Sequence, residues 1–368
     1  ALIRAIRQRN VEAQFVGIGG PLMKAEGMDC WWDTSELSVM GLFEVLSHLP
    51  RLVRLRRQLI TRLVTSKPDV FVGIDAPDFN IGIQKRLRKH GIKVIQYVSP
   101  TVWAWRSGRV KTIAKATERV MCLFPFEPDC YRGQQVKADY TGHPMADEIP
   151  MEVESGPARA ALSVDPAAHV IALLPGSRMS EVEKLTMPML EAAAALAARR
   201  PGIRFLVPAA SAAIRHHVTS AMASFPAVDG RVFDGRSRDV IAASDVVICA
   251  SGTASLEVML INRPMVVCYR LAAMTHWMAR TFKLVKSRFF SLPNILSSKP
   301  LVPELLQEQV TGDRLMEEVS GWLDNPDRCE ALQRHFADLH NLLRKDAAKT
   351  AAAVVLEHAQ GSRTPLAT

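Results

Sequence analysis

The stretch DVFVGIDAPDFNIGIQKRLRKHGIKVIQYVSP, residues 69–100, decides the fold because it contains a strand, a helix and a second strand in order. Its two ends, DVFVGID and KVIQYVSP, are short apolar runs of the kind that form buried strands. Between them, IGIQKRLRKHG has helical periodicity and ends at Gly91, a residue type that commonly terminates helices. Apolar strands that alternate with helices indicate a parallel sheet covered on both faces.

The same alternation continues on both sides of this stretch. Strands are predicted at AQFVGIG before it and at RVMCLFPF after it, with helices over residues 41–65 and in WAWRSGRVKTIAKATE. Pro, Gly and acidic residues interrupt the pattern in GHPMADEIPMEVESGPARAAL, where we place a domain boundary. Beyond it, the predicted strands are HVIALLPGSR, IRFLVPAA, RVFDG, DVVICASG and PMVVCYR, with helices between them.

The chain is therefore predicted to be an α/β protein with two Rossmann-like domains. Its 368 residues exceed the size of a typical single core. The two domains are expected to face each other across a cleft and to bind ligands at the carboxyl ends of their strands. Their predicted bounds are residues 1–150 and 151–325, followed by C-terminal helices and a tail over residues 326–368. Because the opening ALIRAIRQRN has a helical pattern, we expect a strand and its loop to precede it.

Composition and motifs exclude several classes of protein. No run approaches the ~18 apolar residues that span a bilayer. The six cysteines are scattered without a CxxC pair, which favours reduced core residues over disulfides or metal ligands. With no HExxH among the ten histidines, we expect no protein-bound metal. No cofactor is predicted.

Positive charge is concentrated in one region of the chain. The net charge is +9, but residues 51–119 carry sixteen Lys and Arg against four acids, an excess of +12. Such a local excess favours an anionic surface as partner. Nucleic acid is disfavoured because aromatic RNA-binding signatures are absent and the basic residues lie on an apolar helix.

That helix is predicted in GLFEVLSHLPRLVRLRRQLITRLV, residues 41–64, where apolar residues recur at helical spacing with arginines between them. The pattern fits a helix packed on the core or an interfacial helix that places its arginines on anionic headgroups. Each basic residue near such a surface contributes ~1 kcal/mol. Pro50 is predicted to start a second helix. The residues predicted to contact membrane or a lipid acceptor are Leu42, Phe43, Val45, Leu46, Leu49, Leu52, Val53, Arg54 and Arg57.

Two turns of small residues follow predicted strands and precede predicted helices, in LLPGSR, residues 173–178, and ASGTASLE, residues 250–257. Free amides, hydroxyls and a guanidinium at helix starts suit a diphosphate, although ordinary turns and N-caps use the same residue types. Neither GxxxxGK[ST] nor GxGxxG is present, which disfavours NTP hydrolysis and NAD. The residues predicted to bind the nucleotide are Ser177, Arg178, Ser251, Gly252, Thr253 and Glu257. The Glu257 carboxylate is placed to accept hydrogen bonds from the ribose hydroxyls.

Three further features remain open to two interpretations each. Asp75 and Asp78, braced by Pro77 at the end of a predicted strand, are either helix caps or a catalytic base and its neighbour. Asn294, in SLPNIL, residues 291–296, needs hydrogen bonds if buried, from a substrate or from a neighbouring turn. The aromatic and basic residues of VSPTVWAWRSGRV, residues 98–110, either stack on sugar rings or bases or simply pack.

The motifs FVGIDAPDFN, YVSPTVWAWR, LLPGSR, ASGTASLE and SLPNIL, in this order and spacing, resemble those of the lipid A disaccharide synthase family, over about residues 1–360. The resemblance implies a GT-B glycosyltransferase on the cytoplasmic face of a Gram-negative inner membrane. It implies that UDP-2,3-diacylglucosamine donates its sugar, with inversion, to the 6-hydroxyl of 2,3-diacylglucosamine 1-phosphate. The products are the β-1,6-linked disaccharide phosphate and UDP.

The resemblance also assigns residues by motif. The family's catalytic aspartate falls on Asp75, which leaves Asp78 to cap the helix, and its arginine and asparagine fall on Arg178 and Asn294. We then expect Asp75 to act as the general base and Arg178 to stabilise the departing UDP. The family opens with a strand and a Gly-Glu-Thr-Ser-Gly-Asp loop that precede this sequence, and we expect activity to require them. The nucleotide side is matched by Ser251, Thr253 and Glu257.

Two other functions stay open on the residues alone. One is another GT-B enzyme that acts on UDP-GlcNAc, such as an epimerase or a transferase to another lipid carrier. The other is a non-catalytic peripheral lipid-binding module. A homodimer is also compatible with the sequence.

Overall fold

The computed structural model describes residues 1–37, 42–102, 108–270 and 288–360, without the side chains of residues 42–49. The chain divides into two units. The first unit comprises Ala1–Pro144 and Leu343–Thr368, and the second comprises Met145–Leu342. The break after Pro144 lies close to the predicted boundary. The predicted separate C-terminal segment is instead split, because the chain returns to the first unit at Leu343.

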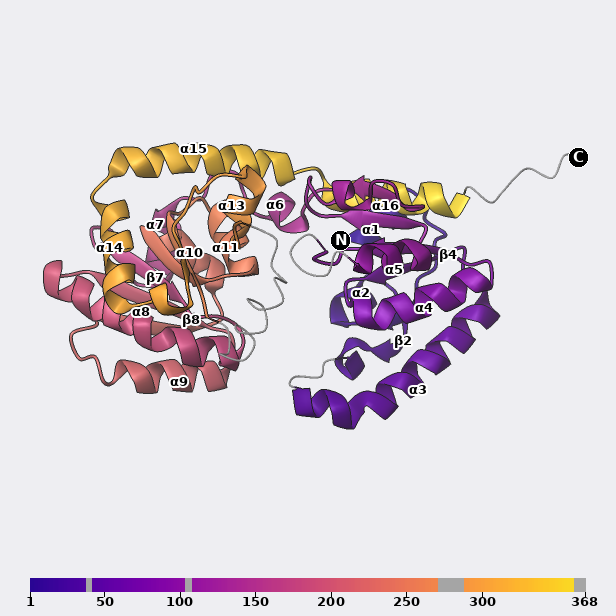
Figure 1. The fold of residues 1–368 in the computed structure, drawn as a ribbon, viewed down its shortest axis with the longest axis horizontal. Helices are drawn as coiled ribbons and strands as arrows, with labels where there is room; N and C mark the ends of the chain where they lie inside the picture. Colours follow the sequence, from indigo (N-terminus) through magenta and orange to yellow (C-terminus); the bar gives the residue numbers. More distant parts are fainter. Residues whose placement is uncertain (38–41, 103–107, 271–287, 361–368) are drawn as a thin grey trace, which may run out of the picture. The chain divides into compact units, whose positions relative to one another are not determined.

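The first unit contains two parallel sheets (Figure 1). One is the pair β1 (Val16–Gly19) and β2 (Asp29–Asp33), and the other has the order β3 (Val70–Ile74), β4 (Lys93–Tyr97), β5 (Arg119–Cys122) and β6 (Lys137–Tyr140). Its helices are α1 (Leu2–Arg7), α2 (Pro21–Ala25), α3 (Leu42–Ser66), α4 (Pro77–Lys89), α5 (Arg109–Ala116) and α16 (Ala347–Gln360), with the 3-10 turns η1 (Thr34–Leu37) and η2 (Pro128–Tyr131).

Two apolar clusters build the core around β3 and β4. Leu59 and Leu63 of α3 pack with Leu87 of α4 in one cluster, to which Phe71 of β3 also belongs. The second cluster joins α16, through residues such as Val355, to α1 and the sheet. The last helix of the chain, drawn in yellow in Figure 1, is therefore part of the core of the first unit.

The second unit is built on one parallel sheet of six strands in the order β12-β11-β10-β7-β8-β9. From β7 the chain adds strands on one side, and from β10 it adds them on the other. The strand order therefore reverses between the neighbours β7 and β10, which is a topological switch point. The strands are β7 (Val170–Leu174), β8 (Arg204–Ala209), β9 (Gly230–Asp234), β10 (Val246–Ala250), β11 (Met265–Tyr269) and β12 (Glu304–Leu306).

Helices connect and cover these strands. The two central strands, β7 and β10, are buried along their whole length. Trp322 of α14 is buried and its indole N–H donates to the Met265 carbonyl at 3.1 Å, which fixes α14 on β11. The helices are α6 (Pro144–Glu148), α7 (Ser155–Ala161), α8 (Met179–Arg199), α9 (Ala212–Met222), α10 (Ser237–Ala243), α11 (Thr253–Leu260), α13 (Leu292–Ser297), α14 (Gly312–Leu323) and α15 (Pro326–Leu343), with η3 (Gln307–Gln309).

Several sequence-based predictions of elements differ from the structure. Pro50 lies inside α3 and does not start a second helix, so that prediction was wrong. Proline costs a helix one hydrogen bond, but the following turns bury Leu55, Leu59 and Leu63 and thereby stabilise the helix. Sequence analysis also missed several elements, among them α14 and the strands β2, β6 and β12. These strands have only three to five residues, too few for a clear alternation.

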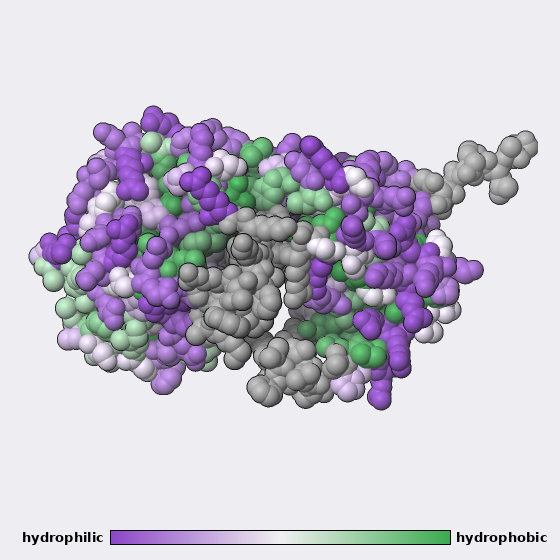
Figure 2. All heavy atoms as spheres, in the orientation of Figure 1, coloured by the Kyte–Doolittle hydropathy of each residue, from purple (hydrophilic) through white to green (hydrophobic). Residues whose placement is uncertain are grey.

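The surface gives no sign of a membrane span among the described residues. None of their helices combines the length and apolar content needed to cross a bilayer. On the face drawn in Figure 2, hydrophilic side chains cover most of both units, with smaller apolar patches between them.

Candidate functional site

The two predicted nucleotide turns lie side by side in the second unit. Leu174, the last residue of β7, pairs with Cys249 of β10. The turns that follow these strands therefore meet at the carboxyl edge of the sheet, at the switch point. Since α8 begins at Met179 and α11 begins at Thr253, both helices start directly after these turns. Their amino ends, with backbone N–H groups not bonded within the helix, lie at this edge.

The turn after β7 has a backbone that requires glycine. Gly176 has a φ of 129°, and a Cβ there would lie 2.6 Å from a Glu181 carboxylate oxygen. Ser177 and Arg178 are exposed, and the Arg178 guanidinium lies 3.2 Å from Glu181. No side chain caps the start of α8. The turn therefore presents an exposed cation and uncapped amides, as expected for a site that binds an anion.

The turn after β10 is open as well. Gly252 is the N-cap residue of α11, with φ 140° and ψ −148°, and no side chain caps this helix. Apart from its chain neighbours, no heavy atom lies within 4 Å of the position of a Cβ on Gly252. Thr253 is exposed, whereas the Ser251 hydroxyl donates to the Phe290 carbonyl at 3.0 Å. The ordinary capping role considered for Ser251 and Thr253 is therefore not observed.

Glu257 and Asn294 have partners within the chain. The Glu257 carboxylate accepts from the Ser237 hydroxyl at 2.6 Å and from Arg238 Nε at 3.1 Å. Asn294 is 1% exposed, and its amide both donates to and accepts from the backbone of Val302, at 2.9 and 3.0 Å. A neighbouring turn thus supplies the hydrogen bonds of Asn294. Its predicted contact with substrate stays a prediction that this arrangement does not favour.

Tyr269, at the end of β11, was missed by sequence analysis. Burial raises the pKa of its hydroxyl, and the Glu181 carboxylate raises that pKa further. The phenol is therefore a neutral hydrogen-bond donor next to the turn after β7. Its ring lies against that of Phe290, with centroids 6.0 Å apart. The only signal in the sequence is its position at the end of an apolar strand.

In the first unit, Asp75 follows the last residue of β3 and its side chain is exposed. Its φ is 48°, and that of Ala76 is 37°, so two consecutive residues other than glycine are left-handed. Such residues cost ~1–3 kcal/mol each and cluster at functional sites. The Asp75 N–H donates to the Tyr97 carbonyl at 2.9 Å. The backbone is thus fixed while the carboxylate points away from the core at the carboxyl edge of the sheet.

Asp78 does not cap α4, so that prediction was wrong. The helix begins at Pro77, and its N-cap is Ala76, without a side-chain capping bond. Proline is well suited to the first helical position because its missing N–H is not needed there. Asp78 is the next residue, and its carboxylate forms an ion pair with Arg109 at the start of α5. The two acids therefore have separate environments.

The residues predicted to contact lipid are only partly described. The side chains of Leu42, Phe43, Val45, Leu46 and Leu49 lie outside the described residues, as do Trp103, Trp105 and Arg106. Further along α3, Leu52 and Val53 are half-buried, and Arg54 and Arg57 are exposed. The stripe that α3 buries consists of Leu55, Leu59 and Leu63. The second half of α3 is therefore a packed amphipathic helix with arginines on its outer side.

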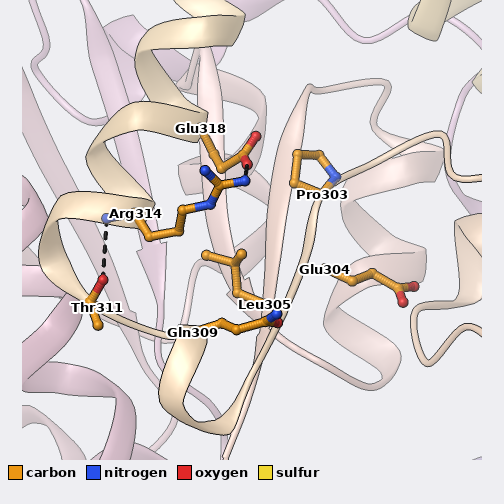
Figure 3. A pocket seen from close by; sticks show the side chains of 7 residues that line it. All are labelled: Pro303, Glu304, Leu305, Gln309, Thr311, Arg314 and Glu318. Carbon is orange, nitrogen blue, oxygen red and sulfur yellow. Dashed lines mark hydrogen bonds and ion pairs between the residues drawn. The ribbon is translucent and has the colours of Figure 1, made fainter.

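A cavity of about 450 Å³ lies elsewhere in the second unit, between β12 and α14. Figure 3 shows that the Arg314 side chain reaches Glu318, with which it pairs at 2.8 Å. Glu304 also lines the cavity, but its carboxylate accepts from the Ser291 N–H and hydroxyl at 2.8 and 2.6 Å. The charged side chains that line this cavity are therefore bonded within the chain, and none of the predicted site residues lies among them. Among the described residues, no group of three His, Cys, Asp or Glu could hold a metal ion.

Two parallel α/β units, with open helix starts at a switch point and an exposed acid at a strand end, place the chain in the GT-B fold class. Two solved structures share the fold over almost the whole chain. UDP-GlcNAc 2-epimerase from Neisseria meningitidis, bound to UDP-GlcNAc, has a TM-score of 0.63 at 11% identity and covers 94% of this chain and 100% of its own. The calicheamicin glycosyltransferase CalG4 has a TM-score of 0.56 at 13% identity, with 99% and 95% covered.

The family follows from the sequence comparison. The family model described as lipid-A-disaccharide synthetase matches residues 1–355, and the chain belongs to that family. The lipid-A-disaccharide synthase of Alkalilimnicola ehrlichii is 47% identical over 364 residues, 98% of this chain and 95% of that protein. The lipid-A-disaccharide synthase of Alcanivorax borkumensis is 45% identical over 354 residues, 96% of this chain and 92% of that protein. The resemblance noted from the motifs, and the predicted fold class, are confirmed.

Proposed function

We propose that this protein is the hexosyltransferase that forms the disaccharide of lipid A. It transfers 2,3-diacylglucosamine from its UDP donor to the 6-hydroxyl of 2,3-diacylglucosamine 1-phosphate and releases UDP. Family membership supports this reaction. The structural observation that carries it is the pairing of Leu174 with Cys249, which brings two uncapped helix starts together at the switch point. That arrangement suits the diphosphate of a nucleotide sugar.

In the proposed mechanism the donor diphosphate lies on the amides at the start of α11, beside Gly252. Arg178 turns from Glu181 to the diphosphate and stabilises the negative charge that grows on the departing UDP. The Asp75 carboxylate takes the proton of the acceptor 6-hydroxyl. The acceptor oxygen then bonds to the anomeric carbon of the donor while the bond from that carbon to the phosphate oxygen breaks, with inversion.

Replacement of Asp75 tests this mechanism. We expect Asp75→Asn to lower UDP formation ~10²–10⁴-fold when both lipid substrates are present, the usual contribution of a general base. Asp69→Asn is the matched control, because Asp69 is an exposed acid at the opposite end of β3. Near wild-type turnover by Asp75→Asn would end the assignment of the base.

The assay of UDP formation, together with a vesicle-binding measurement, separates the other two functions. If UDP-GlcNAc were turned over as readily as the diacylated donor, another UDP-GlcNAc enzyme would be the better description. Vesicle binding without UDP formation under any acceptor would indicate a lipid-binding module. The enzymatic proposal requires UDP formation that depends on both acylated substrates.

We further propose that the enzyme binds peripherally to the cytoplasmic face of the inner membrane. The exposed Arg54 and Arg57 on the outer side of α3 support this, because basic residues attract anionic lipid headgroups. Reversing both charges to glutamate should weaken sedimentation with phosphatidylglycerol vesicles. The same reversal at Arg199 and Arg334, two exposed arginines of the second unit, should not. Equal binding by both double variants would contradict a membrane role for α3.

A further inference from the structure

Three buried side-chain amides lie beneath the turn that carries Asp75. Asn80 and Gln84 belong to α4 and Gln96 to β4, and their exposed fractions are 8%, 0% and 1%. Amides in an apolar interior are costly unless they are hydrogen-bonded. Sequence analysis missed them, although a glutamine inside the apolar strand KVIQY was a visible anomaly. Their bonding partners show what they hold.

The amides bond to the backbone of two neighbouring turns. Gln84 Nε2 donates to Gln96 Oε1 at 2.6 Å. Gln96 Nε2 in turn lies 3.1 Å from the Asp75 carbonyl and 3.2 Å from that of Val98, and is also 3.2 Å from the carbonyl of its neighbour Tyr97. Asn80 Nδ2 donates to the same Asp75 carbonyl at 2.8 Å. One amide group thus bridges the turn after β3 and the turn after β4.

Both turns have backbone conformations that local sequence does not favour. Asp75 and Ala76 are left-handed, and Val98 has a φ of 70°, which is rare for a β-branched residue. Such conformations persist only where surrounding structure holds them. The Gln96 amide supplies part of that hold, because it bonds the carbonyls of both Asp75 and Val98.

The space for these amides depends on Gly73 of β3. A Cβ at Gly73 would lie 2.7 Å from Gln84 Nε2 and 3.1 Å from Asn80 Cγ. Gln84 Oε1 is buried and has no hydrogen-bond partner among the described residues. An apolar side chain at position 84 would remove that unsatisfied acceptor, so packing alone does not favour a glutamine there. The contribution of Gln84 to the structure therefore lies in its hydrogen bond to Gln96.

We propose that Gln96, oriented by Gln84, is a positioning residue that holds the Asp75 turn and the Val98 turn in register, and so sets the direction of the Asp75 carboxylate. The inference rests on the proposed role of Asp75 as the base. A glutamine suits this position because it accepts from Gln84 and donates to the carbonyls at the same time. Leucine can do neither, and glutamate cannot donate when ionised.

Kinetics of Gln96→Leu and Gln84→Leu test the proposal. A displacement of about 1 Å can cost ~10²-fold in rate, so we expect Gln96→Leu to lower kcat ~10–100-fold with the donor KM nearly unchanged. Gln84→Leu, one bond further from the turn, should lower kcat less. Thr117→Val is the control, since Thr117 is buried and bonds the Val94 carbonyl at the opposite end of β4. It should lower the melting temperature without changing kcat, and a Gln96→Leu variant that behaved in the same way would overturn the proposal.

A double-mutant cycle distinguishes the two proposals. If Gln96 acts through Asp75, then Gln96→Leu should cause no further loss of kcat in an Asp75→Asn background. If Asp75→Asn lowers kcat strongly and Gln96→Leu lowers it further by the same factor as in the wild type, Asp75 is the base and the positioning role of Gln96 is refuted. If Asp75→Asn alone keeps nearly wild-type turnover, the base assignment fails and the positioning role fails with it.

Discussion

Replacing Gly252 by alanine tests whether the amino end of α11 binds the donor diphosphate. Gly252 has φ 140° and ψ −148°, a conformation essentially reserved for glycine. A Cβ there meets no heavy atom within 4 Å beyond the adjacent residues of the chain. The substitution therefore causes no clash in the free protein, and its cost is that of the backbone conformation itself, about 1–3 kcal/mol.

This cost predicts the size of the effect on binding. If the turn relaxes to relieve it, the free amides of α11 leave the positions proposed to bind phosphate. The loss of 1–3 kcal/mol then corresponds to ~5–150-fold weaker binding of UDP. Because UDP is water-soluble, its Kd can be measured by isothermal titration calorimetry without the lipid substrates. We expect the Kd of UDP and the KM of the donor to rise together.

Gly235→Ala is the matched control. Gly235 also has a positive φ, 63°, and open space around a Cβ, and it follows β9 at the carboxyl edge of the same sheet. Alanine in this left-handed region costs ~1–2 kcal/mol, so the variant should be less stable but bind UDP normally. If Gly252→Ala lost stability in the same way and kept the wild-type Kd of UDP, the proposed phosphate site at α11 would be refuted.

Three further predictions concern charges. Arg178→Gln should weaken UDP binding in calorimetry by ~10-fold or more, the worth of a charge-assisted hydrogen bond, whereas the exposed Arg199→Gln should not. Asp139→Asn should lower the melting temperature, because Arg119, which is 4% exposed, loses its closest partner. The free-energy cost should stay below the ~3–5 kcal/mol of a fully broken buried pair. The reason is that Glu357 still bonds Arg119. The hydrogen bond from Arg119 lowers the pKa of Glu357 from its ordinary 4.5, so this pair stabilises the fold above that pH and the stabilisation is lost as pH falls through the folded-state pKa. Glu357→Gln should accordingly lower the melting temperature at pH 7, and the difference from wild type should shrink below pH 4.5; a constant difference would contradict the assignment.

The sequence predicted those features that depend on local pattern. The apolar runs around residues 69–100 and the small-residue turns mark where strands end, and the structure places these turns as expected at carboxyl edges. Asp75 could be located at the end of a strand for the same reason. These predictions succeed because a short buried strand and the start of a helix each favour particular residue types at neighbouring positions.

Features that depend on distant parts of the chain could not be predicted. The partner of the Asn294 amide is Val302, across a turn whose conformation no motif specifies. The return of α16 to the first unit depends on apolar contacts with α1, at the opposite end of the sequence. The sequence predicts a helix start at Pro50 because local rules cannot weigh the buried residues that follow it in α3.

The Asp75 turn shows why the geometry of this site belongs to the second group. A left-handed aspartate followed by a left-handed alanine is unfavourable in any isolated peptide. In the folded protein the Asp75 carbonyl accepts from Asn80 of the next helix and from Gln96 of the next strand. The orientation of the carboxylate therefore exists only once α4 and β4 have packed on β3. A motif can mark the position of such a base, but tertiary contacts set the direction of its carboxylate. Substitutions that leave the motif intact can therefore still remove that direction.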